Sequence, residues 1–264
     1  MKASDYRAAA RQTLSGNWKP AVVAGIVYLV IVTWLSCITS ILTKSDPHGF
    51  SWLNSINSIY SILFVLPFGF AFILAFYNFA QDSSDNRLTS NVFTLFAANY
   101  RKGLVSMLLL ALIVTLISII PMIAAAVIAV IPFASEISEF RYIIEDGNIN
   151  PSDFDSMIAF VKFMLVLFPL IFIASIPALV YAYRVTLFPI LLVENPEMGI
   201  RESFKRSAEI MRGHKWQIFC LDFSFIGWFI LGLLSCGIGL LWVIPYQQTA
   251  HSHFYHEMLK SNDE

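Results

Sequence analysis

The chain has 264 residues, of which 57% are hydrophobic and only 13% are charged, and its mean hydropathy is +0.68. A water-soluble core of this length cannot bury so much apolar surface, which excludes an ordinary soluble protein and indicates that lipid solvates the rest. The formal net charge of −1 argues against a nucleic-acid partner, because binding phosphates needs a broad excess of Lys and Arg.

The first residues of the chain predict an amphipathic helix at 3–15. Tyr6, Ala10 and Leu14 recur at four-residue spacing and share one face of such a helix. Residues 1–19 contain no apolar core of signal-peptide length, so we expect this helix to stay in the mature protein, on the inner membrane surface.

Apolar runs then predict the membrane spans. A spanning helix needs roughly 17 to 25 apolar residues, and five segments meet this length: 20–43, 59–80, 104–133, 157–183 and 216–235. The third is longer than a span requires, so it must tilt, protrude or kink at Pro121, where a backbone hydrogen bond is lost.

A sixth span is expected at 237–255. Its apolar part, 237–250, is short and contains Pro245, Gln247 and Gln248. Two interpretations stay open: a full crossing shielded by neighbouring helices, or a re-entrant half-helix.

The distribution of Lys and Arg predicts the orientation. With the N-terminus inside, only Lys44, Arg141 and Lys162 of the 17 cations lie outside. Short loops rich in Lys and Arg stay in the cytoplasm. Six spans with both termini in the cytoplasm satisfy this bias.

Two further amphipathic segments, 90–102 and 196–212, precede later spans. In the second, Pro196 stands where a helix would begin, and Gly213 suits its C-terminal end. We expect both helices to lie on the inner membrane surface. The expected lipid head-group contacts are the cations of the second segment and its neighbour, namely Arg201, Lys205, Arg212 and Lys215.

Asp222 lies roughly 9 Å into the fifth expected span, where a carboxylate is costly unless it is paired or hydrated. One interpretation is a proton or cation site in a polar cavity. The other is a structural carboxylate near the interface that pairs with Arg184, Lys215 or His214, or caps a helix. The full set of candidate binding residues is Asp222, Arg184, Tyr181, Ser224, Trp228 and Tyr246.

Motifs for catalysis or metal binding are weak. His251, His253 and His256 with Glu257 have spacings that can hold a metal, but such a terminal segment more often forms a solvated face. The acidic segment 134–156 lacks the glycine and the glutamate of a calcium loop. Phosphate-binding loops and nucleophile elbows are absent from the sequence. We therefore expect that the protein is not an enzyme and has no catalytic residues, no bound metal and no cofactor.

The C-terminal third resembles a bacterial family of integral membrane proteins, the domain-of-unknown-function family nine-seven-five. The resemblance is strongest over 172–259, with two mild departures at Ala178 and Phe223. It rests on Ile176-Pro177, Tyr181, Tyr183, Glu194-Asn195-Pro196, Ser207, Met211, Gly213, Asp222-Phe223-Ser224-Phe225-Ile226-Gly227-Trp228, Gly237-Ile238-Gly239, Trp242, Pro245-Tyr246 and Phe254-Tyr255. The resemblance implies a helical bundle in the bacterial cytoplasmic membrane and assigns no activity.

The sequence thus predicts an all-α, polytopic membrane helix bundle in a single domain, 1–264. The leading functional hypothesis is a non-catalytic protein that contacts membrane lipids or another membrane protein. The alternative is a small proton- or cation-linked transporter or channel that uses Asp222.

Overall fold

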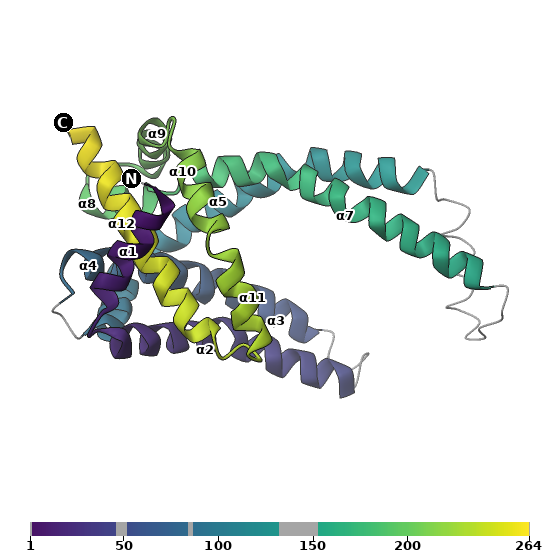
Figure 1. Ribbon diagram of the computed structural model, residues 1–264, viewed down its shortest axis with the longest axis horizontal. Coiled ribbons are helices and arrows are strands. Elements are labelled where there is room, and N and C mark those ends of the chain that lie inside the picture. The colour runs from purple at the N-terminus through teal and green to yellow at the C-terminus, as the bar shows by residue number, and fades with distance from the viewer. Residues whose placement is uncertain (1, 46–51, 84–86, 132–152, 264) are drawn as a thin grey trace. The chain divides into compact units, whose positions relative to one another are not determined.

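The computed structural model describes residues 2–45, 52–83, 87–131 and 153–263 (Figure 1). Within these ranges the regular structure is helical and contains no strand, which confirms the all-α fold class. The chain divides into two compact units, Met1–Leu110 with Tyr183–Glu264, and Ala111–Ala182. Compactness does not show that a unit folds alone, so the expected single membrane domain over 1–264 stays a prediction.

The helices have the following bounds. In chain order they are α1 (Ala3–Leu14), α2 (Trp18–Ser45), α3 (Trp52–Tyr60), the π-helical turn η1 (Ser61–Val65), α4 (Leu66–Gln81), α5 (Leu88–Val130), α7 (Asp153–Arg184), α8 (Phe188–Glu194), α9 (Ile200–Ile210), α10 (Lys215–Phe223), α11 (Ile226–Leu234) and α12 (Leu240–Asp263). Arg141 and most of the acidic segment 134–156 lie outside the described residues.

Five helical stretches are long and apolar enough to cross a membrane. They are Trp18–Leu42, Trp52–Gln81, Leu88–Val130, Val161–Glu194 and Lys215–Leu234. Each overlaps one of the first five spans expected from the sequence. Helix α12 is not among these five in the described part of the chain, so a sixth crossing at 237–255 stays a prediction.

Large apolar side chains cover the outside of these helices. Ile120 is 77% exposed, Phe172 72% and Leu234 76%. Water does not tolerate contiguous apolar surface on this scale. The fold is therefore a polytopic membrane helix bundle, with lipid as the solvent for these side chains.

Helix boundaries differ from the expected ones at the inner segments. The expected helix 90–102 is continuous with the next apolar run in α5, interrupted only at Asn99, whose φ is −113° and ψ is 15°. The expected helix 196–212 begins at Ile200 instead of Pro196. Here the Met198 N–H donates to the Asn195 carbonyl over 2.9 Å, so Pro196 is the second residue of a turn, which suits its fixed φ.

The fifth expected span, 216–235, is two helices. Helix α10 ends at Phe223 and α11 begins at Ile226. The Ser224 hydroxyl donates to the Leu221 carbonyl over 2.6 Å, and such local bonds compete with the helical ladder. The break begins at Ser224, two residues after Asp222. The Asp222 carboxylate therefore lies close to the end of α10.

Helix α4 continues α3 through η1, and Pro67 explains the π-helical turn. A proline inside a helix leaves the carbonyl four residues earlier without its usual donor, and widened turns absorb the clash. That carbonyl belongs to Leu63, and the Tyr100 hydroxyl donates to it over 3.0 Å. The lost backbone bond is thus replaced by a side chain of α5.

Helix α12 is central to the first unit, where it packs against α1, α2, α4 and α11 (Figure 1). Its Phe254 is fully buried and meets the equally buried Tyr6 edge to face at 5.4 Å between ring centroids. On α2, a Cβ added to Gly25 would lie 3.4 Å from the Pro245 ring, so these two helices approach closely. Neighbouring helices therefore cover much of α12, as the shielded interpretation of this segment requires.

The second unit comprises the end of α5 and most of α7. Its buried side chains are mostly small, with Ala125, Ala129, Ala174 and Ala178 each less than 9% exposed. Small residues let helix backbones approach each other in membranes, where the hydrophobic effect gives no attraction between helices. This unit contributes none of the polar clusters described below.

Candidate functional site

Asp222 is the centre of a polar cluster. Its Oδ1 accepts hydrogen bonds from His251 Nε2 over 2.7 Å and from Gln247 Nε2 over 2.9 Å, while Oδ2 accepts one from the Tyr183 hydroxyl over 2.8 Å. Gln247 and His251 are four residues apart, so they share one face of α12. The cluster joins α10, α12 and the end of α7.

Three donors engage both oxygens of a carboxylate that is only 25% exposed, beside a His251 side chain that is 13% exposed. The hydrogen bonds offset the free-energy cost of removing this charged group from water. The arrangement holds three helices together.

The expected partners of Asp222 were wrong. Arg184 is exposed, and His214 is hydrogen-bonded to Gln217 over 3.2 Å. Two partners come instead from α12, which packs against α10, and the third, Tyr183, comes from the end of α7. Sequence spacing gives neighbours along one helix but not such contacts between helices.

The three C-terminal histidines bond to three different helices. His251 reaches α10, His253 is hydrogen-bonded to Thr13 of α1 over 2.8 Å, and His256 contacts α4. The spacing that suggested a metal ligand set therefore places the imidazoles at separate helix contacts.

His256 connects α12 to α4. Its Nε2 donates to the Tyr77 carbonyl over 3.1 Å, so Nδ1 accepts from the Gln81 amide at 3.3 Å. The imidazole also stacks on the Tyr77 ring, with centroids 4.0 Å apart. Burial lowers the pKa of His256 below its ordinary value, and nearby Lys260 lowers it further, against the raising effect of the Tyr77 carbonyl.

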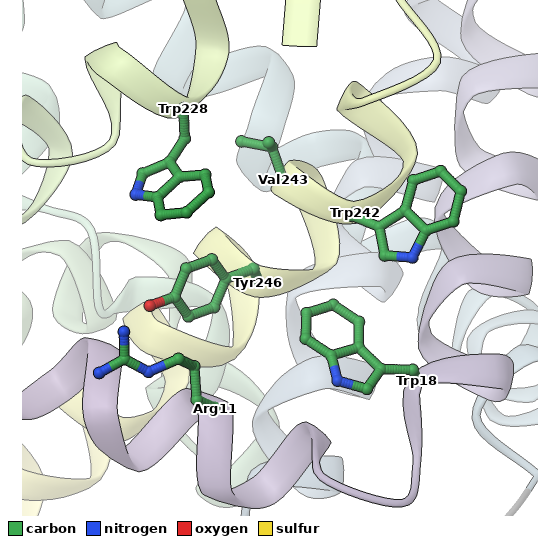
Figure 2. A pocket seen from close by; sticks show the side chains of 6 residues that line it. All are labelled: Arg11, Trp18, Trp228, Trp242, Val243 and Tyr246. Carbon is green, nitrogen blue, oxygen red and sulfur yellow. The ribbon is translucent and has the colours of Figure 1, made fainter. Parts of the chain in front are cut away.

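Trp228 and Tyr246 belong to a different site, a pocket of about 200 Å³ in the first unit. Its walls are mainly aromatic, and Figure 2 shows the side chains around it. The lining residues are Arg11, Trp18, Trp228, Trp242, Val243 and Tyr246. They come from α1, the start of α2, α11 and α12, so segments far apart in the sequence build it.

Tyr246 fixes this pocket to α1. Its hydroxyl donates to the Arg7 carbonyl over 3.2 Å, and its ring meets Phe225 edge to face at 5.0 Å. The guanidinium of Arg7 in turn reaches the Ser224 carbonyl at 3.5 Å. The aromatic wall is therefore held by contacts on both sides.

Two other candidates line neither site. The Ser224 hydroxyl donates to the Leu221 carbonyl within its own turn, while the Ser224 carbonyl accepts from Arg7. Tyr181 belongs to the second unit. The expected lipid contacts are on the surface: Arg201, Lys205 and Arg212 are exposed, and Lys215 is partly exposed.

Sequence reasoning missed several residues of both sites. For Asp222 it missed Tyr183, Gln247 and His251, and for the pocket it missed Arg11, Trp18 and Trp242. One signal was present: Gln247 and His251 are four residues apart, in and just after the short apolar run 237–250, and this spacing indicates a common polar partner. For Arg11 and Trp18 the sequence carries no comparable signal.

The fold and these clusters define a multi-helix membrane protein whose polar groups tie its helices together. The chain belongs to the family described as "Protein of unknown function (DUF975)", which matches residues 1–262. This confirms the family expected from the C-terminal residues and extends the match over nearly the whole chain. No curated protein and no solved structure matches the chain.

Proposed function

We propose that this protein is a non-catalytic, multi-pass protein of the bacterial cytoplasmic membrane that binds anionic lipid head groups through α9. Both termini lie in the cytoplasm in this proposal. The observation that carries it is the separation of charge and burial on α9. Ser203, Phe204, Ser207 and Ile210 are buried, whereas the charged side chains are exposed: three cations, Arg201, Lys205 and Arg206, and two carboxylates, Glu202 and Glu209.

The buried side of α9 is fixed to the bundle. Phe204 meets Phe188 of α8 edge to face at 4.6 Å, and the Ser207 hydroxyl accepts from the Leu187 N–H over 3.1 Å. A helix held in this way presents its cations in a constant direction. Each Lys or Arg close to an anionic membrane contributes about 1 kcal/mol of attraction.

Trp216 supports the same placement. It is 70% exposed and follows Lys215 at the start of α10. Exposed indoles concentrate at the level of lipid head groups, where the ring is partly in hydrocarbon and the N–H is hydrated. Arg206 is the weakest of the α9 cations for lipid, because Glu209 lies 3.7 Å away.

The transporter or channel alternative draws on Asp222 and is less well supported. Both of its oxygens are already engaged by side chains of the same chain, whereas a cation site needs oxygens free to bind the ion. Its test is flux in proteoliposomes: solute or proton movement that Asp222→Asn abolishes would establish it.

A partner protein in the membrane is the other form of the contact hypothesis. Purification from native membranes tests it, and a stoichiometric partner that survives exchange of the lipids would favour it over lipid binding.

The lipid proposal is tested by electron spin resonance of spin-labelled lipids in vesicles that contain the protein. We expect phosphatidylglycerol to be enriched over phosphatidylcholine at the protein surface. Lys205→Glu should lower this preference by roughly fivefold or more, the equivalent of about 1 kcal/mol. Added salt should weaken it as well.

Lys162→Glu is the matched control. Lys162 is an exposed lysine in α7, expected on the outer side, and the substitution changes the net charge equally. Equal preference for the two lipids in the natural protein, or equal losses in the two variants, would refute the proposal.

A further inference from the structure

We propose that the aromatic pocket lined by Arg11 is a discrete site for one anionic phospholipid. Arg11 contacts the phosphate, and the glycerol and first acyl carbons lie against the indoles of Trp18, Trp228 and Trp242. This goes beyond the proposed function, because α9 attracts many lipids by charge whereas this pocket holds a single molecule.

The pocket is almost wholly apolar, and among its described residues the one group that can bind a phosphate is the side chain of Arg11 at its edge. Of the six described residues that line it, Arg11 is the one cation, and none is a carboxylate. A guanidinium binds phosphate oxygens with two parallel hydrogen bonds. Arg11 is exposed, so this side chain can reach a head group without unfolding any contact.

The position of Arg11 is fixed by its helix. The adjacent Ala10 and the next turn's Leu14 are fully buried against the bundle, so the backbone of α1 cannot rotate to carry the guanidinium away. Figure 2 shows Arg11 on the α1 side of the pocket, beside Tyr246 and across from Trp228.

The walls suit the part of a lipid just below its phosphate. The ring centroids of Trp18 and Trp228 lie 6.5 Å and 6.3 Å from that of Tyr246. Trp228 is 45% exposed and Trp242 47% exposed. Indoles in this arrangement offer apolar surface to glycerol and methylene carbons, and they are at home at the membrane interface.

The size of the pocket favours a lipid over a soluble ligand. Pockets that enclose a drug-sized molecule measure roughly 300 to 1,000 Å³, and this one measures about 200 Å³. It is therefore large enough for only a fragment of a drug-sized or larger molecule. A phospholipid meets this condition, because its acyl chains remain in the surrounding bilayer.

Native mass spectrometry of the purified protein in detergent micelles tests the proposal. We expect one molecule of phosphatidylglycerol to bind at least about tenfold more tightly than phosphatidylcholine. Arg11→Gln should raise the dissociation constant for phosphatidylglycerol by about tenfold and remove the preference, because hydrogen bonds to a charged group are lost. Trp242→Ala should weaken both lipids alike.

Lys19→Gln is the control, since Lys19 is an exposed cation next to Trp18 that does not line the pocket. This variant should leave the dissociation constant within about twofold, as expected for a screened surface charge. Lys205→Glu should also retain the bound lipid, which separates this site from α9. Circular dichroism verifies that each variant is folded.

Three outcomes would overturn the proposal. Equal binding of the two lipids means that only an alkyl chain is bound. Unchanged binding in Arg11→Gln means that the lipid lies elsewhere. Displacement of phosphatidylglycerol by millimolar inorganic phosphate means a simple anion site.

Discussion

Replacing Asp222 by alanine tests whether the polar cluster holds α10 to α12. The substitution removes the acceptor of three hydrogen bonds, from Tyr183, Gln247 and His251. Such bonds between side chains of membrane proteins average about 0.6 kcal/mol and reach about 1.7 kcal/mol. We therefore expect Asp222→Ala to lower the free energy of unfolding by roughly 2 to 5 kcal/mol.

Asp222→Asn should cost less, about 1.5 kcal/mol or below. Its Oδ1 still accepts from Gln247 and His251, and its amide can donate to the Tyr183 hydroxyl, which is also an acceptor. The order of the two variants thus separates hydrogen bonding from charge. An asparagine as damaging as alanine would show that the negative charge itself is required.

The assay is unfolding by dodecyl sulfate in mixed micelles, followed by far-ultraviolet circular dichroism. Gln247→Ala and Gln248→Ala form a matched pair, because the two residues are adjacent on α12 and only the first bonds to Asp222. A loss for Asp222→Ala no larger than that for Gln248→Ala would refute the reasoning. A double-mutant cycle with His251→Ala should show a coupling of about 0.6 kcal/mol or more.

Three further predictions concern pH, packing and topology. Burial holds the pKa of His256 below its ordinary value, so the unfolded chain binds a proton at this histidine at a higher pH than the folded chain does. The free energy of unfolding should therefore be highest near about pH 7.5 and fall towards about pH 5. When unfolding is measured at both pH values, the decrease should be smaller in His256→Gln. Gly239→Ala should destabilise by roughly 1 to 3 kcal/mol, because its Cβ would lie 2.8 Å from backbone of α11, whereas Gly227→Ala meets nothing within 4 Å and should not destabilise in the same unfolding assay. Single cysteines at Lys2 and Lys260, in a background without the natural cysteines, should both be protected from an impermeant maleimide in intact cells, and labelling of one alone would contradict the expected topology.

Much of the fold could be predicted from the sequence because hydropathy and helical spacing are local properties. The buried face of α1, formed by Tyr6, Ala10 and Leu14, is an example: the same spacing that predicts the helix also predicts which side is buried. The positions at which helices begin and end were harder to predict. Pro196 suggested a helix start, yet it belongs to a turn, since proline suits both positions.

The sites could be predicted only in part. The cost of a carboxylate at membrane depth identified Asp222, but its partners depend on how α10, α12 and the end of α7 cross. The pocket was harder to predict than the Asp222 cluster. Trp228 and Tyr246 were expected to bind a ligand, but Arg11 comes from a helix more than 200 positions earlier in the sequence.

Helix α12 shows why hydropathy alone misjudges a shielded helix. Its polar side chains lower its apolar content, and a window of hydropathy counts each of them as exposed to lipid. In the structure His251 faces Asp222, His253 faces Thr13 and His256 faces Tyr77. Each of these polar groups therefore meets another helix, which is what a membrane crossing by this helix would require of those at membrane depth. The same residues that weaken the membrane signal of α12 are the ones that bind it to α10, α1 and α4, and this is why its polarity is an argument for a central position in the bundle.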